Sequence, residues 1–369
     1  MSKAADLANL IGNINAGGGG VNRNVIINGA MNVAQRSTSE ANRGDDTGYY
    51  VVDRWKISTG ASTDGRLTLS QDSSAPSGFA NSTKFDCTTA DTSIAAGEFL
   101  QFEQLIEGQN LQAFAKGTSD AKPFAVSFYV KGNASATYVC ELFDADNSRQ
   151  ISKTFNVTTD WTRVELTFPA DTTGAFDDDN ASSLALVIHL NAGSNYTSGT
   201  INSGSWASST NANRVGSGTT SFFDSTDRTF FITGVQLEVG QNATEFEHEP
   251  FAVTHQKCQR YCQIRIGTDG ANGATAQLGI GNARASTAAY FQDRLQVKMR
   301  TAPSLTVSNA TNFYLYQTGA YSVTALGIDT SDANNMLLVA NVSSGLTSPT
   351  FYTLGANNAN AKCIYSAEL

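Results

Sequence analysis

The regular alternation of apolar and polar residues in short segments constrains the fold of this chain more than any other feature. In one such segment, Phe124, Val126, Phe128 and Val130 alternate with residues that are smaller or more polar. Successive side chains of a β-strand point to opposite faces of its sheet, so this period of two is typical of a strand with one buried face. The pattern therefore predicts antiparallel strands.

The number and spacing of such segments predict an all-β protein. Before residue 250 they lie at 66–71, 83–87, 99–106, 124–131, 138–144, 151–157, 163–168, 184–190 and 234–239. Loops rich in Ser, Thr, Asn and Gly join them. Eight or nine strands in this arrangement predict a jelly-roll β-sandwich. Short strands return from Gln277 onward, which predicts a second, smaller C-terminal β domain.

The chain divides into four predicted parts. They are an N-terminal helix with a glycine linker at 1–20, an extended connector at 21–48, the jelly-roll sandwich at 49–250, and a helix plus the small β domain at 251–369. At 369 residues, the chain is longer than a single hydrophobic core usually serves, which agrees with more than one domain.

The N-terminal helix is predicted from Ser2 to Asn13. Leu7, Ala8 and Ile11 fall on one side of it at helical spacing, before a run of four glycines breaks the helix. A helix this short needs packing to persist in water. We therefore expect its apolar stripe to dock on copies of itself or on a partner; a frayed terminus is the alternative.

A loop of small polar residues runs from Asn191 to Ser221, and Tyr196 and Trp206 stand alone in it. Long loops in compact domains are usually functional or disordered. Two large rings among such residues are hard to bury in the domain's own core. We therefore expect Tyr196 and Trp206 to contact either a sugar ligand, by stacking, or a neighbouring subunit.

One clear helix is predicted at 251–264, after Pro250, with Thr254 as its N-cap. It carries His255, Cys258 and Cys262 at a spacing that superficially resembles a metal site. No second pair of Cys or His completes the spacing that zinc requires, so packing is the expected role of these side chains.

Composition excludes several partners. The net charge of -9 and the absence of a basic cluster argue against nucleic acid and against an anionic membrane. No apolar run is long enough for a membrane span, and no secretory signal opens the chain. Five scattered cysteines do not form a disulfide framework. These features predict synthesis in a reducing cytoplasm.

Catalytic and metal sites find no support in the sequence. The three histidines lack a nucleophile or base at a suitable spacing, and His189 is expected on the outward face of its strand, solvated or at the edge of the core. Oxygen-rich loops at 144–147 and 177–179 allow a structural calcium ion, although neither is an EF-hand and a solvated turn is preferred. We therefore expect no enzyme, no cofactor and no catalytic residues.

Several segments together resemble phage tail-fibre and related virion appendage proteins, especially those of cyanophages and other marine phages. They are Asn24–Arg36, Val52–Trp55, Phe128–Gly132, Thr159–Thr162, Ile232–Gly240, Ala243–Glu247, Cys258–Tyr261, Met299–Pro303 and Ser366–Leu369. The resemblance covers nearly the whole chain from Asn24, in a consistent order.

The resemblance implies a structural virion protein that attaches the particle to polysaccharide on the host surface. It further implies a middle domain similar to jelly-roll carbohydrate-binding modules, assembly as a homotrimer, and attachment to other virion proteins through the N-terminal segment that holds Leu7, Ala8 and Ile11. The alternative is a purely architectural virion protein, a decoration or connecting subunit without its own receptor. A glycan-cleaving enzyme is disfavoured.

Overall fold

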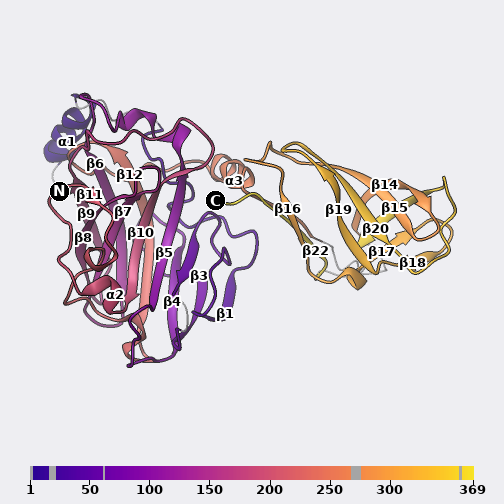
Figure 1. Ribbon diagram of the computed structural model, residues 1–369, viewed down its shortest axis with the longest axis horizontal. Helices are drawn as coiled ribbons and strands as arrows, with labels where there is room; N and C mark the ends of the chain where they lie inside the picture. Colours follow the sequence, from indigo (N-terminus) through magenta and orange to yellow (C-terminus); the bar gives the residue numbers. More distant parts are fainter. Residues whose placement is uncertain (1–2, 16–21, 61–62, 267–275, 357–359) are drawn as a thin grey trace. The chain divides into compact units, whose positions relative to one another are not determined.

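The computed structural model describes residues 3–15, 22–60, 63–266, 276–356 and 360–369. The chain forms two compact units, one comprising 1–254 with Leu369 and the other comprising 255–368 (Figure 1). No helix within the described ranges is long and apolar enough to cross a membrane.

The larger unit is a jelly-roll β-sandwich of two six-stranded antiparallel sheets, as predicted (Figure 1). The first, here called the β12 sheet, has the order β1 (Ser39–Arg43), β3 (Arg66–Asp72), β4 (Ser82–Thr89), β12 (Thr229–Val239), β6 (Phe124–Gly132) and β9 (Thr162–Phe168). The second, here called the β10 sheet, has the order β11 (Ala207–Ser208), β8 (Arg149–Val157), β7 (Ala136–Asp144), β10 (Ser182–Ala192), β5 (Phe99–Glu107) and β2 (Lys56–Thr59).

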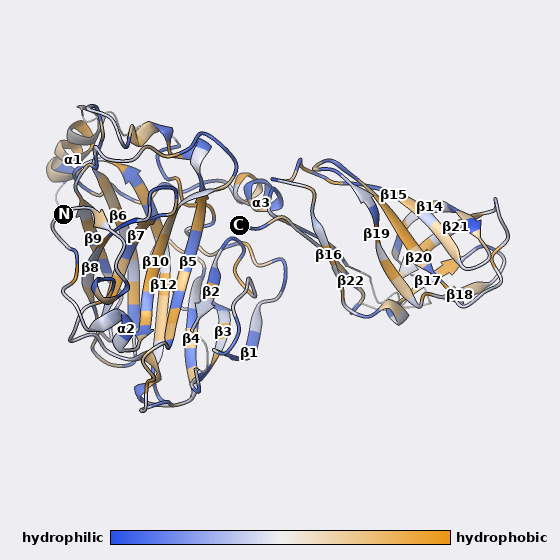
Figure 2. Ribbon diagram, in the orientation of Figure 1, coloured by the Kyte–Doolittle hydropathy of each residue, from blue (hydrophilic) through white to orange (hydrophobic). Residues whose placement is uncertain are grey.

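The core of the sandwich lies between these two sheets, where the alternating apolar residues of both meet. Phe124, Phe128 and Val130 are buried, as the period of two predicts. Trp55 stacks on Phe102, with ring centroids 4.6 Å apart. Hydrophobic residues follow the strands of both sheets in Figure 2. Each fully buried large apolar side chain stabilises the fold by about 1.5–3 kcal/mol relative to its exposed state.

The segment 21–48 is not the extended connector that the sequence predicts. Among its described residues, Met31 and Val33 are buried, and β1 pairs with β3 at the edge of the β12 sheet. The backbone N–H of Val25 also donates to the carbonyl of Leu237, at 3.0 Å. The segment is held in place because its own Ile26 and Met31 belong to the hydrophobic core of the sandwich.

The smaller unit is also all-β. Its three-stranded sheet has the order β13 (Cys262–Ile266), β22 (Lys362–Ser366) and β16 (Ser304–Val307). Its seven-stranded sheet has the order β18 (Ala320–Ser322), β17 (Phe313–Tyr316), β21 (Phe351–Ala356), β14 (Ala276–Ala285), β15 (Ala288–Arg294), β20 (Asn335–Asn341) and β19 (Ala325–Ser331). A separate hydrophobic core fills this unit.

The helices differ from prediction at their ends. Helix α1 spans Lys3–Asn15, close to the predicted range, and the glycine run at 17–20 lies outside the described residues. Helix α3 spans only Phe251–Gln259, because Cys262 begins a strand that pairs with β22. Thr254 therefore lies inside the helix and is not its N-cap.

Candidate functional site

The outward face of the β10 sheet carries polar side chains near the middle of its strands. In β10, Leu186 and Ile188 point into the core, so Val187 and His189 point the opposite way. A ligand that contacts this outward face does not have to disturb the core.

The register of the strands aligns charged residues on this face. Val187 lies opposite Glu103 of β5 on one side and opposite Glu141 of β7 on the other. Lys56 of β2 lies opposite Glu103. A loop after β10 adds Arg214 to the far end. The charged row is defined here as Lys56, Glu103, His189, Glu141 and Arg214.

Hydrogen bonds connect most of the charged row. His189 Nε2 lies 2.7 Å from Glu141 Oε2, and Nδ1 lies 3.3 Å from Gln101 Nε2. Because the amide nitrogen of Gln101 is a donor, Nδ1 accepts and the ring proton on Nε2 is donated to Glu141. Arg214 donates to the same carboxylate through Nε, at 3.0 Å, and through Nη2, at 2.7 Å. This bidentate pair fixes the guanidinium.

The carboxylate of Glu141 is buried and yet stays charged. Burial by itself raises the pKa of a carboxyl group. The hydrogen bond from His189 and the charge of Arg214 outweigh burial, so the pKa of Glu141 lies below its ordinary value. The charged row therefore has an ionised centre at neutral pH.

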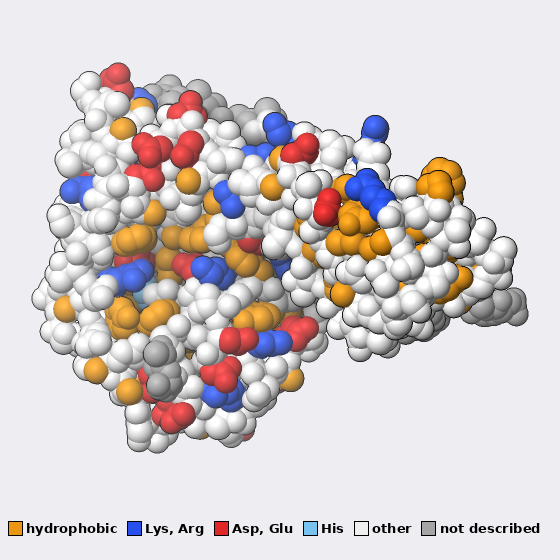
Figure 3. Space-filling model, turned by 45° about the vertical axis from the view of Figure 1, so that its right-hand side comes forward, with side chains coloured by type: hydrophobic (Ala, Val, Ile, Leu, Met, Phe, Trp, Pro, Cys, Tyr) orange, Lys and Arg blue, Asp and Glu red, His pale blue; other side chains and the backbone are white. Residues whose placement is uncertain are grey.

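The two ends of the charged row are its most exposed members. The side chains of Lys56 and Arg214 are 21% and 16% exposed, whereas Glu141 is fully buried. The guanidinium carbon of Arg214 lies 5.2 Å from the centre of the half-buried Phe143 ring. Figure 3 shows acidic, basic and hydrophobic side chains side by side across the middle of the larger unit. The surface thus offers cationic donors beside an apolar ring.

The loop at 193–221 lies along one side of this face and is fixed to it. Asn202 O accepts from the backbone N–H of Ser152, at 2.7 Å, and the N–H of Thr220 donates to Thr137 O, at 2.9 Å. Next to the loop, Asn191 is buried and neither polar atom of its side chain has a hydrogen-bond partner within the described residues. An amide left in this state is a candidate for a ligand or water contact.

Tyr196 and Trp206 do not share one environment, contrary to the sequence prediction. Tyr196 lies in the short helix α2 (Ser194–Thr197), is half-buried, and packs edge-on against Phe99 with centroids 5.3 Å apart. Trp206 is only 7% exposed and belongs to the sandwich core, where its ring packs on Phe124. Its indole N–H donates to Pro169 O, at 2.9 Å. The expectation that Trp206 is hard to bury in its own domain, and that it contacts a ligand or a neighbouring subunit, is therefore wrong.

The predicted docking stripe of α1 is open to solvent in the single chain. Leu7 is 57% exposed, Ile11 is 50% exposed, and Ala8 is exposed as well. Large apolar side chains at this exposure on one short helix are costly unless another surface covers them.

The acidic loop at 144–147 already holds a cation. The ammonium of Lys116 lies 2.5 Å from Asp144 Oδ2 and 3.2 Å from Asp171 Oδ2, and it donates to the carbonyls of Thr173 and Gly174. Lys116 and Asp144 are fully buried. At this loop, Lys116 takes the place that the sequence allows for a calcium ion. The described residues contain no group of three or more His, Cys, Asp or Glu side chains suited to a metal.

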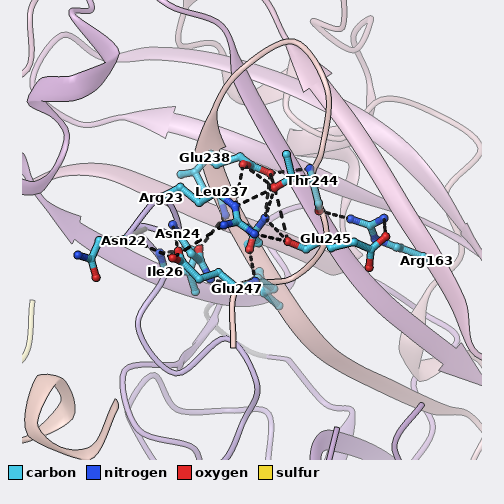
Figure 4. Close-up of polar contacts among 12 residues, drawn as sticks. Asn22, Arg23, Asn24, Ile26, Arg163, Leu237, Glu238, Thr244, Glu245 and Glu247 are labelled. Carbon is cyan, nitrogen blue, oxygen red and sulfur yellow. Dashed lines mark hydrogen bonds and ion pairs between the residues drawn. The ribbon is translucent and has the colours of Figure 1, made fainter. Parts of the chain in front are cut away.

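A second polar cluster, on the β12 sheet, joins the first residues of the sandwich to its last (Figure 4). The carboxylate of Glu247 accepts from the backbone N–H groups of Asn22, at 2.7 Å, and Asn24, at 2.9 Å. Buried Glu238 accepts from the backbone N–H of Thr244, at 2.7 Å. These contacts tie residues 22–24 to the segment 234–247, although the two lie far apart in the sequence. The segment 234–247 therefore serves folding.

The prediction that His189 lies on the outward face of its strand is correct, but His189 is not solvated, because it is paired with the buried Glu141. The charged row itself was not predicted. His189 is only 2% exposed, and Glu141 stands between the apolar Cys140 and Leu142 in its strand. A charged residue in such a strand must be paired, because burying it alone is costly. That rule could have marked Glu141, whereas Arg214 comes from a loop whose path the sequence does not specify.

Comparison with known proteins gives only distant likenesses. No family model and no curated protein matches the chain. The enzymatically active domain of tailspike protein 4 of bacteriophage CBA120 is 13% identical, with a TM-score of 0.32, and the match covers 59% of this chain and 21% of that one. The module TmCBM61, solved with β-1,4-galactotriose, is 11% identical, with a TM-score of 0.31 and coverages of 59% and 99%. A putative sugar-binding protein from Bacteroides thetaiotaomicron is 12% identical, with a TM-score of 0.31 and coverages of 58% and 99%. TM-scores at this level carry no weight for function.

Proposed function

We propose that this chain is a structural subunit of a phage virion appendage, a tail fibre or similar, that attaches the particle to glycan on the host surface as a homotrimer. The virion role rests on the ordered sequence resemblance from Asn24 onward. The glycan role rests on the charged row. In this proposal the protein is not an enzyme.

The charged row carries the proposal because its chemistry suits a polyhydroxyl ligand. Sugars are bound by planar polar groups that exchange paired hydrogen bonds with hydroxyls, and by rings that pack on their apolar faces. Arg214 and Lys56 present donors at the surface, and half-buried Phe143 supplies a ring next to Arg214. Since Glu141 holds the guanidinium in place, little side-chain entropy is lost on binding.

Substitution of Arg214 tests this role. Arg214→Gln in the full chain is expected to weaken retention on immobilised bacterial lipopolysaccharides and capsular polysaccharides at least tenfold. Arg163→Gln is the matched control, because Arg163 is similarly exposed and also pairs with a glutamate, but lies on β9 in the other sheet. Equal retention of both variants and the unsubstituted chain would contradict the glycan role of the charged row.

A purely architectural virion protein is the second candidate. The near-complete burial of Glu141 and His189 favours the architectural role. Residues of the charged row hydrogen-bond to one another, and such a row stabilises a sheet without any ligand. In that case the chain binds none of the polysaccharides, yet immunogold microscopy still finds it on purified particles of the phage that encodes it.

A further inference from the structure

Two buried carboxylates near the start of β5 have no cation beside them. Asp91 is 7% exposed and Glu98 is 2% exposed. Neither forms an ion pair with a Lys, Arg or His side chain of the described residues. The buried Asp144, by contrast, is paired with Lys116. Because an ionised carboxylate in the interior is costly unless its charge is compensated, this pair needs an explanation.

The two carboxyl groups face each other. They lie within hydrogen-bonding distance, and Asp64 adds a third negative charge nearby. Asp91 Oδ1 accepts from the backbone N–H of Ser93, at 2.9 Å. Asp91 Oδ2 and Glu98 Oε2 are buried and have no hydrogen-bond partner within the described residues, since ionised carboxylates accept but do not donate. Two such charges in contact require a proton or a cation between them.

The side chain of Asn191 points to the same place. A register shift between His189 and Asn191 sets Asn191 opposite Leu100 of β5, which is buried in the core, so Asn191 also faces inward. Glu98 lies two residues before Leu100 and therefore shares this face. The backbone N–H of Gly193 donates to Glu98 O, at 2.8 Å, which continues the pairing of the two strands beyond Asn191. Diagonal neighbours of this kind are within reach of a long side chain such as glutamate.

The amide of Asn191 is evidence for a ligand that is independent of the acidic pair. Asn191 is 3% exposed, and neither its Oδ1 nor its Nδ2 has a hydrogen-bond partner within the described residues. A proton shared by Asp91 and Glu98 would satisfy the two carboxylates and leave this amide without a partner. A cation among the three side chains would be bound by an oxygen of each.

The chemistry of the three side chains selects the cation. Carboxylate and amide oxygens are the usual ligands of calcium, which accepts irregular shells of six to eight oxygens. Zinc prefers imidazole and thiolate, and this set has neither. We propose that Asp91 Oδ2, Glu98 Oε2 and Asn191 Oδ1 bind one calcium ion. The set holds two carboxylates and an amide, so water completes the coordination shell.

The acid–base properties of Glu98 agree with a bound cation. Burial raises the pKa of Glu98, and the hydrogen bond from Asp91 and the charges of Asp91 and Asp64 add to this, against a backbone hydrogen bond from Ala95. The anionic form is therefore unfavourable without a compensating charge. Because protons compete with calcium for this carboxylate, the affinity for calcium should fall in acid.

The site joins two loops of the sandwich. Asp91 and Glu98 belong to the loop 90–98 between β4 and β5, and Asn191 lies at the end of β10, next to the loop 193–221. The backbone N–H of Asn195 also donates to Ala96 O, at 3.0 Å. A calcium ion at this position therefore fixes the loop 90–98 against the end of β10.

Thermal unfolding of the full chain, first freed of divalent ions with EGTA, tests the proposal. Calcium chloride at about 5 mM exceeds the dissociation constants of about 0.1–1 mM that weak calcium modules show. It should raise the melting temperature of the sandwich by about 3 °C or more, and magnesium chloride at the same concentration should raise it less. Isothermal titration calorimetry should find one calcium ion per chain.

Substitutions locate the ion. Glu98→Gln keeps the shape of the side chain and lets its amide donate to Asp91, so this variant should fold without calcium and lose the calcium-dependent rise. Asn191→Leu keeps the volume without the oxygen and should lower the calcium affinity at least fivefold. Asp178→Asn is the matched control, because Asp178 is exposed in the acidic loop at 177–179, and it should keep the full rise.

Three outcomes would overturn the inference. The first is an unsubstituted chain that neither binds calcium nor melts higher in its presence, which would leave a shared proton between Asp91 and Glu98. The second is a Glu98→Gln variant that keeps the rise. The third is loss of the rise in Asp178→Asn, which would place the ion in the other acidic loop. The glycan proposal is tested separately, by the retention of Arg214→Gln.

Discussion

At the scale of the residue, Lys116 shows how one side chain can replace a bound ion. Its ammonium has two carboxylates and two carbonyls around it, all within 3.2 Å, and no exposed surface. Sequence reasoning identified the acidic loop at Asp144 but not its cation, because Lys116 is 28 residues away and no local pattern connects the two. The contact exists only after the sandwich has folded.

Removal of Lys116 is expected to destabilise the sandwich strongly. Lys116→Met leaves the buried carboxylate of Asp144 without its cation, whereas Asp171 keeps its pair with Arg149; an uncompensated buried charge costs about 3–5 kcal/mol of unfolding free energy. Urea unfolding followed by tryptophan fluorescence measures the loss, because the ammonium lies 5.5 Å from the Trp206 ring. Lys84→Met is the control: it breaks the exposed pair with Asp86 and should cost about 1 kcal/mol or less. Equal losses in both variants would refute the role of the cluster.

The lowered pKa of Asp171 predicts how the stability of the protein changes in acid. Burial would raise its pKa, but hydrogen bonds from Arg149 and from the backbone of Thr173, with the charge of Lys116, hold the pKa below its ordinary value. A carboxyl group whose pKa is lowered on folding stabilises the folded state above its unfolded pKa of about 4. That stabilisation is lost as the pH falls from about 4 through the pKa that Asp171 has in the folded protein.

The melting temperature should therefore fall between pH 6 and pH 3, and Asp171→Asn should show a smaller fall than the unsubstituted chain. Asp160→Asn serves as the control because Asp160 is exposed. A fall of the same size in Asp171→Asn would show that other groups set the acid response.

At the scale of the element, the strands were predictable and the segments without regular periodicity were not. The apolar alternation of β6 and β10 fixed both their existence and their buried faces. The segment 22–48 has no such period, and its burial depends on contacts with strands far away in sequence. Trp206 was misplaced for the same reason: its loop folds back onto the core through contacts that no local pattern encodes.

Helix α1 was predictable in position because its apolar residues recur at helical spacing. Its stripe predicts a role in association. Leu7→Glu with Ile11→Glu places charges on the exposed stripe and should weaken self-association of the full chain at least tenfold in sedimentation experiments. Leu7→Met with Ile11→Met keeps the stripe apolar and should associate normally. If the glutamate variant associates like the methionine variant, α1 is not a contact between copies.

At the scale of the whole molecule, the chain has two hydrophobic cores that share no residue. All five cysteines are buried, and none of them forms a disulfide within the described residues. An all-β chain with a large and a small part is predictable from the sequence, because turn-rich loops and a short helix separate two sets of strands. Which outward faces carry function could not be read from it, since solvated faces and binding faces have the same period.

Separate cores predict separate unfolding. Calorimetry of the full chain should resolve two transitions, because each unit buries its own apolar surface and can unfold while the other stays folded. Lys116→Met should lower only the transition of the sandwich. Phe291→Ala should lower only the other, since Phe291 is 1% exposed in the smaller core and its truncation costs about 3–5 kcal/mol. A single transition that both substitutions shift equally would mean that the two units unfold as one.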